Sequence, residues 1–320
     1  MNDMLDNDTK DRNPLVTFAL FAYNQEKYIA AAVDGALAQS YSPLEIILSD
    51  DCSTDRTFEI MQAKVSNYDG PHKIVLIRNN SNMGFGPHVF SVARTGLGRL
   101  LIAAAGDDVS KENRVQEIVK KWVETKCSAF TTDEEHYDES GVSQGYFRRQ
   151  MMAECTVEDF SSINKSLGCT WGIERELLLM YPIPSRNMIN EDVLLGLMAM
   201  LHKGIAYLPL ATVERTTGVG ISANRNFPSK LKEIIVFLTR RAALLEAMIE
   251  ILKTTDNINV MQNAERDFKA ISAMLYYARS GKSFFNAFLS IPVHGKKSHF
   301  EKLLKIPIFR LMNARGCINE

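Results

Sequence analysis

The strongest constraint on the fold is a series of short, unbroken apolar runs with helix-like segments between them. Four such runs lie in the first third of the chain: Leu15–Ala22, Leu44–Leu48, Lys73–Arg78 and Leu100–Ala105. Each is too short for a typical helix, and short apolar runs bounded by turn residues are typical of buried parallel strands. The segments between them carry apolar residues at helical spacing. We therefore predict an α/β fold: a Rossmann-like, largely parallel sheet built from right-handed crossovers, with helices on both faces.

Helix limits are predicted from capping residues and apolar spacing. We expect Asn24 to cap the first helix, Ser53 or Asp55 to cap the second, and Ser110 to open a later one. Beyond Cys127 the regular alternation stops, and the polar stretch 131–145 is predicted to be a loop. Further helices are expected at Val89–Arg94, Trp171–Met180 and Asp192–His202, followed by two long amphipathic helices between Ser229 and Gly281.

Two acidic pairs stand directly after two of the predicted strands. Asp50 and Asp51 follow the run that begins at Leu44, and Asp107 and Asp108 come just after the run Leu100–Ala105. In an open α/β sheet, ligands bind in the crevice beyond the carboxyl ends of the parallel strands. Carboxylates at that edge require a metal ion, a ribose hydroxyl or a base edge as a partner. This arrangement predicts a nucleotide-sugar site.

Composition narrows the class of protein. The chain has 320 residues, 46% of them hydrophobic, and a net charge of −1, which allows one large domain or a catalytic domain with a smaller appendage. No apolar run reaches the roughly 18 residues that a membrane-spanning helix needs, and residues 1–13 lack the apolar core of a signal peptide. The five cysteines are scattered and form no CxxC pair, which indicates reduced thiols and no zinc site. We expect a cytoplasmic protein.

Charge is distributed unevenly along the chain. Residues 225–320 hold 16 basic and 8 acidic side chains, whereas residues 1–224 hold 21 basic and 30 acidic ones. No recognised nucleic-acid-binding signature accompanies the basic residues, so a nucleic-acid partner is not expected. We therefore expect a catalytic domain over residues 14–220 and a basic, amphipathic helical extension over residues 225–320.

Several short segments occur in an order and at a spacing that are specific when taken together. They are Phe18–Asn24, Ala38–Tyr41, Glu45–Asp55, Asn82–Gly86, the pair Ala93-Arg94, Gly106–Asp108 and the pair Glu191-Asp192. Together they resemble the family 2 glycosyltransferases of the bacterial surface-polysaccharide type, and Glu45–Asp55 is similar to that family's EIIVVDDGSTD segment. The resemblance extends over residues 14–215 and implies the A-type nucleotide-sugar (GT-A) fold.

The resemblance also implies roles for side chains at the donor. Asp51 would accept a hydrogen bond from the nucleotide base, Tyr23 would lie beside the ring of the base, and the backbone at Phe21 would complete the pocket. Asp108 would bind a divalent cation, Mn²⁺ or Mg²⁺, that bridges the diphosphate. Asp107 would reach the ribose or a second metal position.

Further roles concern the phosphates and the acceptor. By resemblance, Arg94 would meet the donor phosphates or form a salt bridge with Asp107, and Arg215 would contact a donor phosphate from a flexible loop. Asp192 would be the base that deprotonates the acceptor hydroxyl, with Glu191 as the alternative. Because Asp192 opens a predicted helix, the helix dipole would lower its pKa and weaken it as a base, so its positioning would have to compensate.

The chain departs from the family's pattern at three places. Cys52 replaces the usual glycine of the first acidic cluster, which should change the turn but not the carboxylates. The second cluster, Gly106-Asp107-Asp108, lacks the spaced Asp-x-Asp form, and Thr95 replaces the Asn that commonly follows Arg94.

The implied function is inverting transfer of a sugar from a nucleotide-diphosphate sugar, expected to be a UDP-sugar, to a hydroxyl of a saccharide or polyprenyl-linked acceptor. The implied setting is the synthesis of bacterial O-antigen, capsule or another surface polysaccharide. Two alternatives stay open: a non-catalytic sugar-nucleotide-binding protein, and a sugar nucleotidyltransferase. The second needs a Gly-rich loop with Arg and Lys after the first strand, which Tyr23–Glu26 does not supply. Trp171 either stacks on an acceptor sugar or lies in the core.

The last segment, Ser283–Arg315, interleaves aromatic and aliphatic residues with lysines. This pattern suits an interfacial anchor on an anionic membrane, since each Lys or Arg near the surface can add about 1 kcal/mol. It equally suits a helical cap that packs on the catalytic domain or forms a homodimer through the C-terminal helices. Peripheral binding to the inner face of the cell membrane and packing against protein are both retained as interpretations.

Overall fold

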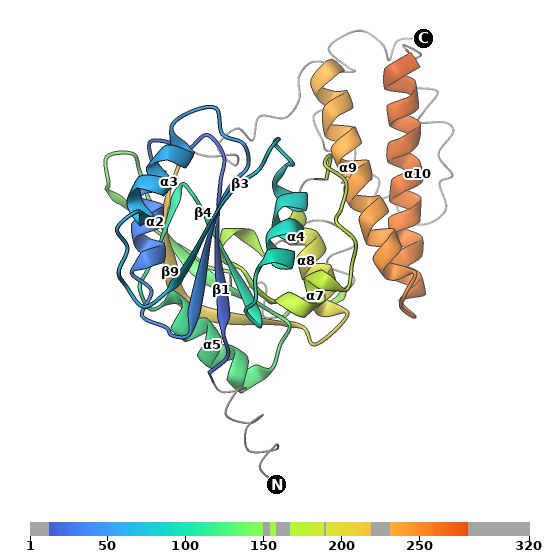
Figure 1. Cartoon of the computed structure of the whole chain (residues 1–320). Helices are drawn as coiled ribbons and strands as arrows, with labels where there is room; N and C mark the ends of the chain where they lie inside the picture. Colours follow the sequence, from blue (N-terminus) through green and yellow to red (C-terminus); the bar gives the residue numbers. More distant parts are fainter. Residues whose placement is uncertain (1–12, 150–153, 158–166, 189, 219–230, 281–320) are drawn as a thin grey trace. The chain divides into compact units, whose positions relative to one another are not determined.

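The computed structural model describes residues 13–149, 154–157, 167–188, 190–218 and 231–280. By their internal contacts, the residues form two compact units. The first comprises residues 1–186 and 190–223 and holds the sheet, and the second comprises residues 187–189 and 224–320 and holds two long helices (Figure 1).

The first unit is built on a mixed sheet, to which the described residues contribute nine strands in the order β3-β2-β1-β4-β8-β6-β9-β5, with β7 paired to β6. The strands are β1 (Val16–Ala22), β2 (Leu44–Asp50), β3 (Lys73–Arg78), β4 (Leu100–Ala105), β5 (Asp108–Ser110), β6 (Ala129–Tyr137), β7 (Ser143–Phe147), β8 (Gly172–Glu174) and β9 (Ile205–Thr216). Strands β1 to β4 run parallel, whereas β8 and β5 pair antiparallel to their neighbours.

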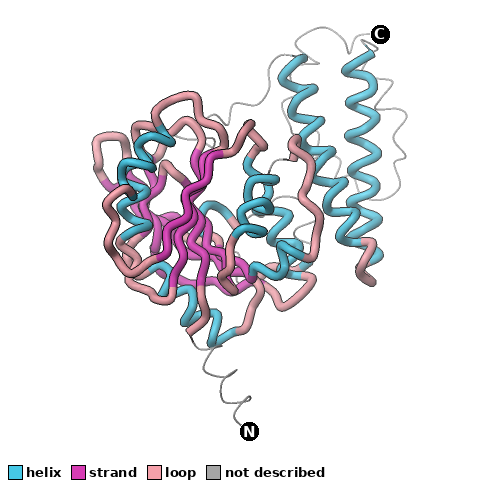
Figure 2. The backbone as a smooth tube through the Cα atoms, viewed as in Figure 1, coloured by secondary structure: helices cyan, strands magenta, loops and turns pink. Residues whose placement is uncertain are grey.

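Helices cover both faces of this sheet, as predicted (Figures 1 and 2). Successive residues of a strand point to opposite faces. Phe18 and Leu20 of β1 belong to the core cluster that includes residues of α2 (Ile29–Leu37), α3 (Thr57–Val65) and α5 (Arg114–Thr125). Phe21, one residue on, packs edge-on against His88 of α4 (Phe85–Thr95) on the other face. All seven residues of β1 are buried, which is why the strand reads as an unbroken apolar run.

In the first half, the four predicted strands are confirmed, although β3 is partly exposed, and the predicted helix starts are corrected. Helix α3 begins at Thr57 with Arg56 as its N-cap, so neither Ser53 nor Asp55 has that role, and α4 begins at Phe85, not at Val89. Helix α2 begins at Ile29 with Tyr28 at its N-cap, so Asn24 is not a capping residue. Asn24 instead accepts a hydrogen bond from the Thr54 amide (2.8 Å) in the loop after β2. Ser110 ends β5, and α5 begins only at Arg114.

In the second half, the polar stretch predicted as a loop is mostly strand. Residues 129–137 form β6 because β9 runs beside them in parallel and supplies their hydrogen bonds. The segment Trp171–Met180 is also not one helix, since it comprises β8 and then α7 (Arg175–Leu179). Helix α8 (Glu191–Met200) confirms the helix predicted at Asp192–His202.

The second unit contains the two long helices that the sequence predicts, α9 (Leu231–Leu252) and α10 (Ile258–Ser280). They pack against each other, and Arg279 donates a hydrogen bond to Thr239 Oγ1 (3.2 Å). Within the described part of the chain, no helix combines the length and the apolar character needed to cross a membrane. The predicted anchor segment, Ser283–Arg315, lies outside the described residues.

Candidate active site

The strand register brings the two acidic turns together at the end of β1. Asp50 lies beside Ala22, and Ala105 lies beside Phe21 on the other side of β1. The amide of Asp51 donates to the Ala22 carbonyl and the amide of Gly106 donates to the Phe21 carbonyl, both at 2.9 Å. The backbone at the end of β1 therefore fastens both turns to one edge of the sheet, the carboxyl edge at which α/β sheets bind ligands.

Asp51 is 3% exposed and organises the loop before α4. Its Oδ1 accepts hydrogen bonds from Asn79 Nδ2 and from the Met83 amide, both at 2.8 Å, and its Oδ2 accepts one from the Gly84 amide (3.0 Å). An ionised carboxylate offers about four acceptor positions, so these three bonds leave one for a further donor.

The turn after β2 is held by Asp50. This fully buried carboxylate accepts hydrogen bonds from the amide (2.9 Å) and the hydroxyl of Ser53, which agrees with a role in ordering the loop. Cys52 adopts a left-handed backbone with φ 63°. Glycine adopts that conformation without strain, so Cys52 keeps the positive φ angle that is typical of glycine.

The two aromatic residues at the end of β1 have different environments. Tyr23 is 42% exposed, which leaves ring surface for a ligand. Phe21 is buried and lies edge-on to Phe85 (centroids 5.3 Å apart) and to His88. Its ring therefore packs in the core, and its carbonyl accepts the hydrogen bond from the acidic turn. Trp171 is 1% exposed, which places it in the core and rules out the stacking interpretation.

Asp107 and Asp108 share one charged environment. Burial, together with the neighbouring charges of Asp107 and Glu134, raises the pKa of Asp108 to about 7, although Arg215 acts to lower it. Burial likewise raises the pKa of Asp107, opposed by Arg215 and by a hydrogen bond from Gln25. Two adjacent carboxyl groups that resist ionisation in this way are stabilised when a cation binds between them.

The cation opposite the acidic pair is Arg215. It lies on β9 directly across from Asp108 on β5, and it is also in register with His136 on β6. The sequence placed Arg215 on a flexible loop, and the structure places it in a strand. The Arg215 guanidinium lies 3.5 Å from Glu134 Oε2.

Arg94, the other predicted phosphate ligand, is not brought to this edge. Helix α4 runs back along the sheet, so its last turn lies near the beginning of β1, where Gly98 bonds to Thr17. The Arg94 guanidinium donates to the carbonyls of Phe90 (2.8 Å) and Tyr181 (2.9 Å). An 11-residue helix spans about 16 Å, which separates Arg94 from the acidic turns.

The predicted base lies in the first turn of α8. Asp192 Oδ2 accepts a hydrogen bond from the Gly168 amide (3.1 Å), which fixes the orientation of this carboxylate. Burial, together with the charge of Asp192, raises the pKa of Glu191 to about 8. Glu191 is therefore mostly protonated at neutral pH.

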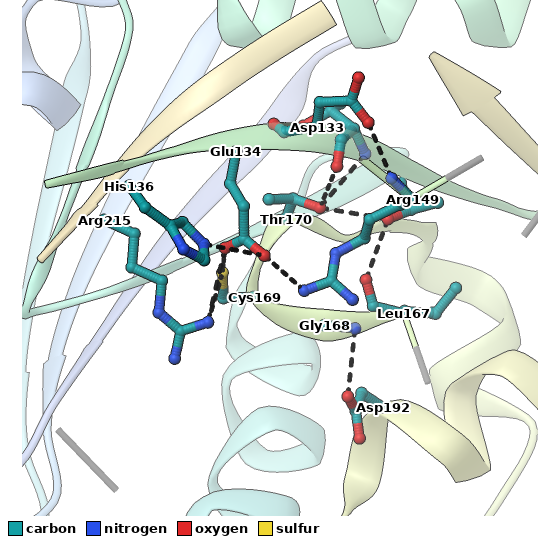
Figure 3. Close-up of polar contacts among 12 residues, drawn as sticks. Asp133, Glu134, His136, Arg149, Leu167, Gly168, Cys169, Thr170, Asp192 and Arg215 are labelled. Carbon is teal, nitrogen blue, oxygen red and sulfur yellow. Dashed lines mark hydrogen bonds and ion pairs between the residues drawn. The ribbon is translucent and has the colours of Figure 1, made fainter. Parts of the chain in front are cut away.

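Sequence reasoning missed a cluster of polar side chains around Glu134 (Figure 3). Glu134 is 1% exposed and contacts Arg149 (2.7 Å), the thiol of Cys169 (2.9 Å), Arg215 (3.5 Å) and His136 (3.7 Å). Burial would raise the pKa of Glu134, but the two arginines, the thiol and His136 together lower it. Burial raises the pKa of the Cys169 thiol well above its usual value, so Cys169 is a hydrogen-bond donor here and not a thiolate nucleophile.

The sequence signal for this group was weak but present. Residues 131–137 read TTDEEHY, a run of β-branched and aromatic residues interrupted by acids, and its acids hid the strand pattern. Only the pairing of β6 with β9 shows that Glu134 and His136 share a face with Arg215.

The side chains at the acidic edge fit a divalent cation. In the described ranges, no group of three or more His, Cys, Asp or Glu side chains is arranged to hold a metal ion without help. Mg²⁺ and Mn²⁺ do not need such a group when they are held by one or two carboxylates and by substrate phosphates. Asp107 and Asp108 supply oxygen ligands of the right kind.

Comparison with known sequences gives a consistent result. A sequence profile described as "Glycosyl transferase family 2" matches residues 17–179, just over half of the chain. The glucosyltransferase WfaP of Escherichia coli (UDP-Glc:alpha-D-GlcNAc-diphosphoundecaprenol beta-1,3-glucosyltransferase) is 29% identical over 42% of this chain and 51% of its own length. Chondroitin synthase of Escherichia coli is 30% identical over 45% of this chain and 21% of its own length. The match thus spans about half, or less, of these relatives.

Solved structures share the fold. The crystal structure of S. aureus TarS 1-349 in complex with UDP-GlcNAc has a TM-score of 0.54 and 18% identity, covering 83% of this chain and 87% of that one. The mannosyltransferase PcManGT from Pyrobaculum calidifontis, in complex with GDP-Man and Mn²⁺, has a TM-score of 0.54 and 14% identity, covering 96% and 81%. With the sheet described above, these similarities show a GT-A fold, and the profile match shows that the chain belongs to glycosyl transferase family 2, related to enzymes of polysaccharide biosynthesis.

Proposed function

We propose that this chain is an inverting, metal-dependent, hexosyl-type glycosyltransferase that uses a UDP-sugar donor. The observation that carries the proposal is the convergence of Asp51, Asp107 and Asp108 on the end of β1, with Arg215 across from Asp108. These groups supply an acceptor for a base, ligands for a cation and a positive charge for phosphate at one edge.

The base would bind at the end of β1. Asp51 keeps one acceptor position for the ring N–H of uracil, and the half-exposed Tyr23 supplies a face on which the base stacks. Stacking of a base on an aromatic ring contributes roughly 1–3 kcal/mol. TarS, whose structure contains UDP-GlcNAc, supports a uridine nucleotide as the first choice of donor.

The diphosphate would lie between the acidic pair and Arg215. Asp108, with Asp107 beside it, would hold Mn²⁺ or Mg²⁺, and PcManGT, which has the same fold, binds Mn²⁺ with its donor. The cation, when bound, supplies Lewis-acid stabilisation of charge on the departing diphosphate. The Arg215 guanidinium would stabilise that charge from β9.

Proton transfer is assigned to Asp192. As the acceptor oxygen forms its bond to the anomeric carbon, the bond from that carbon to the diphosphate breaks, and the Asp192 carboxylate takes the hydroxyl proton. Because its pKa is raised to about 8, Glu191 is mostly protonated at neutral pH, which makes Asp192 the first choice of base. Because displacement takes place in one step, the anomeric configuration inverts.

The acceptor is proposed as a saccharide or a polyprenyl-linked sugar. WfaP, as its name states, acts on a diphosphoundecaprenol-linked sugar, which supports this class. A lipid-linked acceptor would lie at a membrane, so we propose that the C-terminal segment binds the anionic inner face of the cell membrane. The competing proposal is that the C-terminal helices form a homodimer. Flotation of the full chain with neutral and with anionic vesicles, alongside sedimentation analysis, separates the two.

The decisive experiment measures release of nucleoside diphosphate from a panel of UDP-, GDP- and dTDP-sugars, with Mn²⁺ and with EDTA. The proposal expects Mn²⁺-dependent release from a UDP-sugar, with the product β-linked if the donor is α-linked. Tight binding of UDP with no release from any donor, even with acceptor present, would favour a binding protein. Release of pyrophosphate from a nucleoside triphosphate and a sugar phosphate would favour a nucleotidyltransferase.

A further inference from the structure

The carboxylate of Glu134 lies where two parts of the candidate site meet. Its Oε2 receives the Cys169 thiol (2.9 Å) and faces Arg215 Nη1 (3.5 Å), while its Oε1 receives Arg149 Nη2 (2.7 Å) (Figure 3). The side chain is 1% exposed. A carboxylate this deeply buried is tolerated only when charges and hydrogen bonds compensate it, and here they come from β9, from the segment after β7 and from the turn η2 (Gly168–Thr170).

The first connection leads from Glu134 to the donor side. Arg215 lies in register with Asp108, and its guanidinium reaches Glu134. Arginine has several rotatable bonds, so an anion behind it limits the positions that its guanidinium can take. Glu134 therefore holds Arg215 opposite the acidic pair before a donor arrives.

The second connection leads from Glu134 to Asp192, the proposed catalytic base. The Cys169 thiol binds Glu134, and the residue before it, Gly168, donates its amide to Asp192 Oδ2 (3.1 Å). The turn is also fixed at its other end, because Thr170 Oγ1 donates to the Thr132 carbonyl (2.8 Å). A shift of Cys169 would thus move the amide that orients Asp192.

Close packing around Arg149 keeps this turn in place. Gly168 has φ +73°, and a Cβ atom added there would overlap the Arg149 guanidinium. The Arg149 guanidinium, which binds Glu134, therefore packs directly against the backbone of Gly168.

We propose that Glu134 is a positioning residue that sets Arg215 for the donor diphosphate and, through Cys169 and Gly168, sets Asp192 for the acceptor. The inference rests on the proposed function, because it assigns Glu134 a part in the same transfer. It adds to that function a residue that couples Arg215, at the donor diphosphate, to Asp192, the catalytic base.

The test compares Glu134→Gln with Glu135→Gln. Glu135 is the matched control: it is the next residue on the same strand, points to the other face, and bonds to Lys111 (3.1 Å) and Ser143 (3.3 Å). Two measurements are made, UDP binding by calorimetry with Mn²⁺ and UDP release from the UDP-sugar accepted by the wild type. Glu134→Gln is expected to lower turnover about 10²-fold, because small misplacements of reacting groups have effects of this size, whereas Glu135→Gln stays within about 2-fold.

Four further variants test the two connections and guard against misfolding. Cys169→Ala removes the thiol and is expected to lower kcat, and Cys169→Ser, which keeps a donor to Glu134, is expected to restore most of kcat. Arg215→Ala is expected to raise the donor KM, and adding Glu134→Gln to it is expected to raise that KM little more. Non-additivity of this kind is what coupled residues show.

Each possible result bears on one proposal. If Glu134→Gln and Glu135→Gln have equal turnover, or if the Glu134 and Arg215 effects on KM add fully, Glu134 is not a positioning residue. If kcat of Cys169→Ala equals that of the wild type, the connection to Asp192 is refuted. Absence of UDP binding and of UDP release in the wild type itself would instead refute the proposed function.

Discussion

The two halves of the sheet carry their candidate functional side chains in different ways. Around the ends of β2 and β4, Asp51 and Asp107 follow buried apolar strands, and Asp108 comes next as the first residue of the short strand β5. In the half formed by β6, β8 and β9, Glu134 and Arg215 lie within longer strands, and Cys169 lies in a short turn. In the first half, apolar strand residues form the core and the acids that bind ligands follow them in the sequence. In the second half, the strands themselves carry the charged side chains of the site.

This difference explains why the two halves were predicted unequally. Strand β6 has Glu134 and His136 on the side of the cluster and Glu135 on the other side, bonded to Lys111. With acidic or polar groups on both faces, the strand shows neither an apolar run nor an apolar-polar alternation. Where functional groups are built into a strand, the usual sequence pattern of that strand is lost.

The sharpest test of the first half is Asp108→Asn. The change removes a carboxylate that we assign to the cation, and loss of a metal ligand removes several kcal/mol of charge stabilisation, about 10³-fold in turnover. UDP binding with Mn²⁺, measured by calorimetry, is expected to weaken as well. Asp69→Asn, at an exposed loop residue, serves as the control. Retained Mn²⁺-dependent binding in Asp108→Asn would contradict the assignment.

The matching test of the second half is Asp192→Asn. Loss of the general base is expected to lower turnover about 10²-fold or more, while UDP affinity stays within about 2-fold because Asp192 is assigned to the acceptor hydroxyl and not to the nucleotide. Steady-state kinetics and calorimetry on the same preparation check this. Unchanged turnover would remove Asp192 as the base.

Two arginines test which half supplies the charge for phosphate. Arg215→Ala is expected to weaken UDP binding about 10-fold, the size expected for a lost charge-assisted hydrogen bond. Arg94→Ala is expected to leave UDP affinity within about 2-fold, since Arg94 is bonded to Phe90 and Tyr181 at the other end of α4. The reverse order of effects would show that the phosphates lie elsewhere.

The pH dependence of stability tests the environment of Glu191. In the native state Glu191 keeps its proton up to about pH 8, whereas in the unfolded chain it loses the proton near its ordinary value of 4.5. The native state binds more protons in this window, so this group's stabilisation is complete below pH 4.5 and is lost as the pH rises through about 8. Urea titrations are expected to show a smaller decline between pH 5 and 8.5 in Glu191→Gln, and the same decline in both proteins would count against the assignment.

The smallest expected effect is at Cys52. Its left-handed backbone is strained for any residue other than glycine, so Cys52→Gly is expected to raise the free energy of unfolding by at most about 1 kcal/mol. Cys52→Ala, which keeps the strain, is the control. A marked loss of stability in Cys52→Gly alone would mean that the thiol makes contacts that outweigh the backbone strain.

Much of the first half was accessible from the sequence because local pattern and tertiary role agree there. Strand β3 begins and ends at the predicted residues, and the acidic turns lie at the predicted edge. Helix starts were less well predicted, since Asn24 has a good capping side chain but is used by Thr54 in the neighbouring loop. A side chain that satisfies a local rule is free to satisfy a distant partner instead.

The amino-acid order alone determined that β1 to β4 are parallel strands and that acids follow two of them, because the strands buried on both faces, β1, β2 and β4, demand unbroken apolar runs. Only the tertiary structure decided which charges meet. It placed Arg215, and not Arg94, opposite Asp108, and it gathered residues 149, 169 and 215 around the carboxylate of Glu134. The reason is that strand pairing brings together residues that are far apart in the sequence, such as Asp108 and Arg215, which are 107 residues apart. No local sequence pattern records which strands pair.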